Sequence, residues 1–186
     1  MFIQTEATPN PATLKFLPGK PVLPGGTRDY RDADAAAESP LAQKLFSVSG
    51  VAGVFLGQDF ITVTRSGAEW QHMKPAILGL IMDHYLSGEP VLLGESPRAE
   101  APGDEFFEEG DTEVVNTIKQ LLDTRVRPAV AQDGGDITFQ GFREGVVFLN
   151  MKGSCAGCPS STATLKHGIE NLLRHLVPEV SEVRAV

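Results

Sequence analysis

Both cysteines of this 186-residue chain lie in one short segment, residues 153–159, which reads GSCAGCP. Cysteines at this CxxC spacing can direct two sulfur atoms to one point, so the pair could ligate a metal or cluster, form a reversible disulfide, or do neither. Pro159 suits the first position of a helix, and apolar residues at helical spacing follow it. Cys155 and Cys158 are therefore expected on a loop at a helix N-terminus.

A helix N-terminus favours the thiolate, the ligating form of cysteine, by about 0.3–1 kcal/mol in exposed settings. The glycines at 153 and 157 predict an accessible loop. Two thiolates are half of the four that a 2Fe-2S or 4Fe-4S cluster normally takes. His167 lies about 13 Å past Cys158 along a helix and His175 lies farther, so neither can share a metal with the pair. A second copy of the chain is the economical source of the missing ligands, which would make cluster binding imply a dimer.

Other uses of the two cysteines remain open at this point. A CxxC pair between a strand and a helix is also typical of a thioredoxin-like thiol-disulfide oxidoreductase. The same thiolates bind zinc when iron is absent, and the cysteines could also be buried and inert. A phosphate-binding loop is excluded because no Lys-Ser or Lys-Thr follows the glycines.

The composition, 41% hydrophobic and 22% charged, is typical of a soluble globular protein, and the net charge of −8 opposes binding to nucleic acid or an anionic membrane. No apolar run approaches the roughly 18 residues of a membrane span. Two cysteines and the absence of a signal-like N-terminus favour a reducing compartment. Because Met1 directly precedes the first expected strand, we expect a bacterial cytoplasm, with the mitochondrial matrix after transit-peptide removal as the alternative.

The acidity is concentrated in the middle of the chain. Residues 87–110 carry seven acidic groups, one basic group and three prolines. Such a stretch buries little apolar surface and repels itself, so it predicts a flexible acidic linker. The linker divides the chain into two small domains, residues 1–86 and 111–186, and the expected fold class is α+β.

The N-terminal half predicts strands at 2–5, 13–17, 51–56 and 60–64, a loop at 18–38, a short helix after Ser39-Pro40, and an amphipathic helix over 70–84. It has no cluster of catalytic residue types, and His72 and His84 are expected at the surface or its boundary, without a function. The C-terminal half predicts a helix over 114–126 ending near Arg127-Pro128, a tight turn at 133–136, strands at 137–142 and 146–149, a helix over 159–176 and a final strand at 180–186. Its order is α-β-β-α-β, with the CxxC loop before the second helix.

Motifs along most of the chain carry a family resemblance. Residues 111–186 resemble the C-terminal domain of the NifU family, and residues 2–86 resemble the N-terminal domain of Nfu-type proteins. The matching segments, by position, are 2–6, 8–11, 14–16, 127–128, 133–137, 153–161, 164–166, 168–170 and 177–180.

The resemblance implies a carrier without catalytic turnover. Such a protein holds a 4Fe-4S cluster between two subunits through Cys155 and Cys158 and passes it to apo iron-sulfur proteins, after receiving it from an upstream scaffold or donor. Longer NifU proteins have a scaffold domain and a 2Fe-2S domain with further cysteines. This chain has no cysteines for either, so synthesis of clusters from iron and sulfide is not implied.

Overall fold

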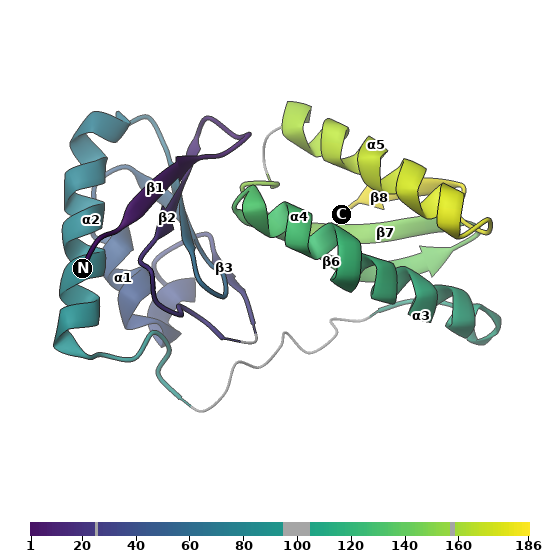
Figure 1. Cartoon of the computed structure of the whole chain (residues 1–186), viewed down its shortest axis with the longest axis horizontal. Helices are drawn as coiled ribbons and strands as arrows, with labels where there is room; N and C mark the ends of the chain where they lie inside the picture. Colours follow the sequence, from purple (N-terminus) through teal and green to yellow (C-terminus); the bar gives the residue numbers. More distant parts are fainter. Residues whose placement is uncertain (25, 95–104, 157–158) are drawn as a thin grey trace. The chain divides into compact units, whose positions relative to one another are not determined.

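The computed structural model describes residues 1–24, 26–94, 105–156 and 159–186 (Figure 1). The chain divides into two compact units, Met1–Ala99 and Glu100–Val186, each with its own apolar core. Both units combine helices with a sheet, which confirms the predicted α+β class. Among the described residues, no helix has the length and apolar composition that crossing a membrane requires.

The first unit is built on an antiparallel sheet. Its described strands, in the order β1-β2-β5-β4-β3, are β1 Gln4–Ala7, β2 Thr13–Leu17, β3 Arg28–Tyr30, β4 Val51–Leu56 and β5 Ile61–Arg65. The predicted hairpin in residues 51–64 is β4 and β5, whose turn is closed by the Gly57 amide donating to the Phe60 carbonyl at 2.9 Å. The segment 18–38, expected to be loop, also contains β3 and a 3₁₀ turn, η1 Ala35–Glu38.

Two helices cover one face of this sheet, α1 Pro40–Phe46 and α2 Trp70–Ser87 (Figure 1). The Ser39 side chain caps α1 by accepting a hydrogen bond from the Ala42 amide at 3.1 Å, as the Ser39-Pro40 pair predicts. The apolar stripe of α2 packs into the core through Met73, Ile77 and Ile81. His84 continues this stripe and is fully buried, so the expectation of a surface or boundary position was wrong for it.

The second unit opens with a helix that changes its winding. A 3₁₀ turn, η2 Glu109–Asp111, leads into α3 Thr112–Leu121, a π-helical turn, η3 Leu122–Val126, and α4 Arg127–Gln132. The helix was predicted to end near Arg127-Pro128, yet it continues to Gln132. Pro128 falls in the first turn of α4, directly after the wider π turn, where the missing proline N–H is tolerated.

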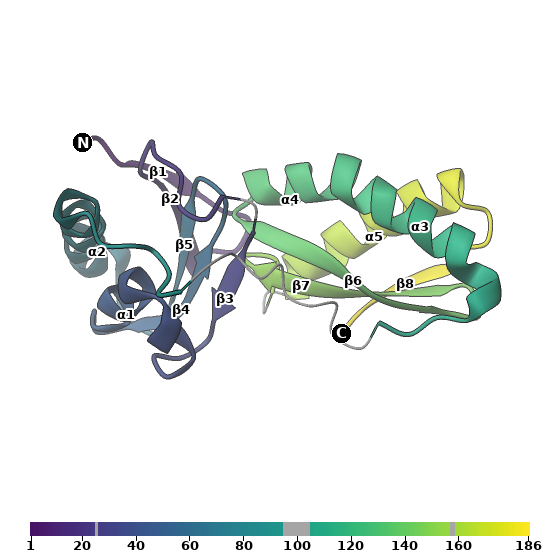
Figure 2. The same ribbon diagram turned by 90° about the horizontal axis from the view of Figure 1, so that it is seen from below.

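A three-stranded sheet in the order β6-β7-β8 completes the described part of this unit. β6 Gly135–Arg143 and β7 Val146–Gly153 form an antiparallel hairpin, and β8 Glu182–Ala185 pairs with β7 in parallel. Parallel pairing needs a crossover, which α5 Pro159–Leu176 supplies. α3, α4 and α5 lie on the same face of the sheet (Figure 2), so the predicted order α-β-β-α-β is present.

The described ends of the predicted linker, residues 87–110, pack against the two units. On the first unit, the Leu93 amide donates to the Glu38 carbonyl at 2.7 Å. On the second, the Phe142 amide donates to the Phe106 carbonyl at 2.8 Å, and the Phe106 ring contacts Phe148. Residues 95–104 of the predicted linker lie outside the described residues.

Candidate functional site

Cys155 lies just after β7, on the loop that leads into α5. Its sulfur is a free thiol, its side chain is only 6% exposed, and it belongs to the apolar core of the second unit. The flanking glycines predicted an accessible cysteine, and this prediction was wrong for Cys155. Cys158 lies outside the described residues.

The turn at residues 133–135 is hydrogen-bonded to the cysteine loop. The Ser154 amide donates to the Gly134 carbonyl at 3.2 Å, and the Ser154 hydroxyl donates to the Asp133 carbonyl. Ser154 is buried, so both bonds are shielded from water. On the other side, the Thr162 hydroxyl of α5 donates to the Cys155 carbonyl at 2.8 Å. The backbone of Cys155 is thus fixed by neighbours from the turn and from the helix.

Gly135 leaves the space that the Cys155 sulfur occupies. A Cβ atom at Gly135 would lie 2.6 Å from Cys155 Sγ and 2.7 Å from the Lys152 carbonyl oxygen. Gly135 pairs with Gly153 in the β6–β7 ladder, so the ladder brings it under the loop. Any side chain at this position would collide with the sulfur or with backbone.

A partly buried ion pair between Arg127 of α4 and Asp136 supports the same turn. Arg127 donates through Nε and Nη2 to the two carboxylate oxygens of Asp136, at 2.9 and 3.0 Å. Asp136 is 4% exposed, and its Oδ1 also accepts from the Ile137 amide at 2.8 Å. The Asp136 hydrogen bond is the main cause that raises the pKa of Arg127, with the Asp123 carboxylate adding to it. The pair ties the start of α4 to the start of β6, next to Gly135.

Burial raises the pKa of Cys155 to about 11. A side-chain hydrogen bond between Cys155 and Ser154 works in the opposite direction, while the negative charges of Asp133 and Asp136 raise the pKa further. The sulfur is therefore a neutral thiol near pH 7. The predicted stabilisation of a thiolate by the helix N-terminus is overridden here, because α5 begins four residues after Cys155 and desolvation dominates.

The sequence identified the turn at 133–136 but not its place beside the cysteine. The structure brings Gly135 and Ser154 against Cys155, and the Arg127–Asp136 pair supports the same turn, whereas sequence spacing showed only glycines suited to close backbone approach. Across the described ranges, no group of three or more His, Cys, Asp or Glu residues is placed to hold a metal ion. Within these ranges, Cys155 is thus the ligand candidate of the site.

Fold and site together define a two-unit α+β protein with Cys155 on a strand-to-helix loop. Residues 3–88 match the family described as "Scaffold protein Nfu/NifU N terminal", and residues 118–184 match the "NifU-like domain". The chain belongs to the Nfu/NifU family of iron-sulfur cluster scaffold proteins. The thioredoxin-like alternative receives no support from these matches.

Relatives from distant organisms are similar along the whole chain. A Homo sapiens protein named "NFU1 iron-sulfur cluster scaffold homolog, mitochondrial" is 52% identical over 188 residues, which cover 100% of this chain and 72% of that protein. A Drosophila sechellia protein of the same name is 53% identical over 188 residues, covering 65% of its length. The solution structure of a NifU-like protein from Saccharomyces cerevisiae is 29% identical with a TM-score of 0.46, and the match covers 51% of this chain and 87% of that one.

The close contact at Gly135 predicts the effect of a single methyl group. Gly135→Ala should lower the free energy of unfolding of the second unit by about 1–3 kcal/mol, because the new Cβ collides with the sulfur and with backbone. Gly168→Ala is the matched control: that glycine is exposed on α5 with open space around it, so alanine should stabilise by about 0.5–1 kcal/mol. Urea unfolding measures both, and equal effects of the two substitutions would contradict the steric role of Gly135.

Burial of Cys155 predicts slow alkylation with a shifted pH profile. In a Cys158→Ser background without cluster, the iodoacetamide rate of Cys155 should keep rising towards pH 11, whereas in denaturant it should level off above about pH 8.5. Because the folded-state pKa lies above the unfolded value, stability linked to this thiol is complete below about pH 8.5 and is lost as the pH rises towards 11. A native profile that levels off at or below pH 8.5 would show that the sulfur is solvated.

Proposed function

We propose that this chain carries a 4Fe-4S cluster, held between two copies by Cys155 and Cys158 of each, and delivers it to apo iron-sulfur proteins. An upstream scaffold or donor supplies the cluster. The observation that carries the proposal is Cys155 on the strand-to-helix loop of a NifU-like domain, with Cys158 three residues later in the sequence. The chain's two cysteines provide half of the usual four ligands, which supports sharing between two copies.

Because Cys155 is buried, cluster loading requires chemical changes at its sulfur. Cysteine ligates as the thiolate, so loading the cluster removes a proton from a sulfur that burial keeps protonated. The sulfur must also leave its core contacts, which include its close approach to Gly135. The hydrogen bonds of Ser154 and Thr162 to the surrounding backbone keep the loop in place while the sulfur changes its environment.

The proposed carrier performs no catalytic reaction of its own, and the relatives are named as scaffolds rather than enzymes. Their names also bear on location. They support the mitochondrial matrix, which the sequence left as the alternative, and give no support to the bacterial cytoplasm that Met1 favoured. We therefore propose a mitochondrial location for this activity.

Anaerobic reconstitution with iron and sulfide tests the ligand assignment. We expect about four iron and four sulfide per dimer, and loss of the cluster in both Cys155→Ser and Cys158→Ser. Ala163→Ser adds a hydroxyl at an exposed position on α5 near the loop and should bind normally. A stable cluster on a sized monomer, or retention in either cysteine variant, would show that the assignment is wrong.

The reduced apo protein also separates the proposal from thiol-disulfide exchange. A buried sulfur whose pKa lies near 11 is a poor nucleophile at neutral pH, so insulin disulfides should be reduced no faster than by a simple free thiol. Rates like those of thioredoxin would instead support the oxidoreductase alternative.

The first unit has no cysteine, and we propose that it increases the local concentration of the cluster domain near acceptors. Deleting residues 1–86 should leave the cluster content unchanged but slow transfer to acceptors at low concentration, with the deficit shrinking as acceptor approaches saturation. Transfer rates of both proteins against acceptor concentration measure this. Superimposable curves would remove the docking role.

A further inference from the structure

The chain that follows α2 returns to lie across the start of α1. The Ser39 hydroxyl, which also caps α1, donates to the Val91 carbonyl at 2.7 Å, and the Leu93 amide donates to the Glu38 carbonyl at 2.7 Å. Val91 and Leu92 pack against the core of the first unit. Residues 88–93, here called the latch, thus attach the start of the predicted linker to the first unit.

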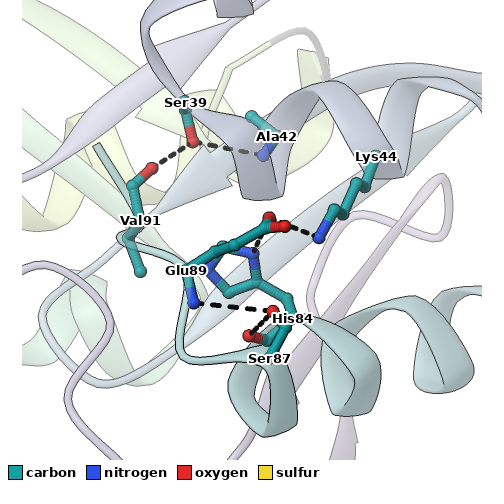
Figure 3. Close-up of polar contacts among 7 residues, drawn as sticks. All are labelled: Ser39, Ala42, Lys44, His84, Ser87, Glu89 and Val91. Carbon is teal, nitrogen blue, oxygen red and sulfur yellow. Dashed lines mark hydrogen bonds and ion pairs between the residues drawn. The ribbon is translucent and has the colours of Figure 1, made fainter. Parts of the chain in front are cut away.

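The latch places a carboxylate beside a buried histidine. His84 is fully buried on α2, and neither ring nitrogen has a hydrogen-bond partner in the described part of the chain. Its Nδ1 lies 3.8 Å from Glu89 Oε2, and the same oxygen accepts from Lys44 Nζ of α1 at 2.6 Å. Figure 3 shows the Glu89 carboxylate between the lysine and the imidazole ring.

The surroundings of His84 favour its neutral form. Burial lowers its pKa most, the Lys44 ammonium of α1 lowers it further, and the Glu89 carboxylate of the latch raises it by a smaller amount. The remaining ring contact is with Tyr85, the next residue of α2, which meets the imidazole edge-on and is uncharged near pH 7. These are the titratable groups that act on His84 among the described residues, and their balance opposes an imidazolium.

We propose that residues 88–93 form a proton-sensitive latch that docks on the first unit while His84 is neutral and detaches when His84 is protonated. Detachment lets water reach Nδ1 and hydrate the imidazolium. The same step removes Glu89, Val91 and Leu93 from their contacts, so more of the linker is released from the first unit. This inference concerns residues far from the cysteine loop in sequence, and it does not rest on the proposed carrier function.

The pH range over which the latch responds follows from the pKa of His84 in the docked and undocked states. Undocked, His84 is solvated and its pKa rises towards the ordinary histidine value of about 6.5; docked, its pKa is lower. Above pH 6.5 the histidine is neutral in both states and docking is strongest. Below pH 6.5 only the undocked state takes up a proton, so docking weakens by up to tenfold per pH unit until the docked pKa is reached. Glu89 remains ionised in this range because its hydrogen bond to Lys44 lowers its pKa.

Hydrogen exchange of the full-length protein, followed by NMR from pH 8 to pH 5, tests the latch. The Leu93 amide reports docking, and the Val22 amide, bonded to the Gln58 carbonyl at 2.8 Å, reports the rest of the unit. We expect the protection factor of Leu93 to fall below pH 6.5 while that of Val22 stays constant. In His84→Leu, whose side chain takes up no proton, Leu93 protection should not change with pH.

A second variant keeps the test decisive if His84→Leu does not fold. Lys44→Met removes the charge that opposes the imidazolium, so the pH-dependent loss of Leu93 protection should become smaller than in the unmodified protein. Constant Leu93 protection in the unmodified protein overturns the latch. The same is true of an undiminished loss in His84→Leu or Lys44→Met, and of a parallel loss at Val22, which would indicate unfolding of the whole unit.

Discussion

The position of Cys155 depends on the absence of a side chain at Gly135. The sulfur, the Lys152 carbonyl and the loop amide of Cys155 all approach the α-carbon of Gly135 so closely that no Cβ fits. This contact can form because the β6–β7 ladder pairs Gly135 with Gly153, and because Arg127 holds the neighbouring Asp136. One steric constraint thus connects helix, hairpin and cysteine loop.

Sequence patterns predicted most helices and strands because their signals are local. The serine before Pro40, the β-branched residues and turn of the β4–β5 hairpin, and the apolar stripes of α2 and α5 are all signals between residues close in sequence. The same reasoning failed at Pro128, where a π-helical turn lets the helix continue. It also failed at His84, because the burial of a polar residue depends on which segment returns to cover it, and the returning segment was predicted to be linker.

At the site, too, features set by neighbouring residues could be predicted, whereas features set by contacts distant in sequence could not. CxxC spacing alone selected Cys155 and Cys158 as candidate ligands. Exposure of Cys155 could not be predicted, because it depends on a turn twenty residues earlier in the chain. A glycine beside a cysteine suggests access, but a glycine across the ladder creates the space in which the sulfur is buried.

The parallel pairing of β8 with β7 has a consequence for synthesis of the protein. β7 ends at Gly153, but its parallel neighbour begins only at Glu182, after the whole of α5 has been made. The first unit can fold while the ribosome is still producing the second. The core of the second unit, in contrast, stays incomplete until β8 supplies Val183. During that interval the nascent chain exposes apolar residues, among them the stripe of α5, so productive folding relies on rapid closure of the final crossover.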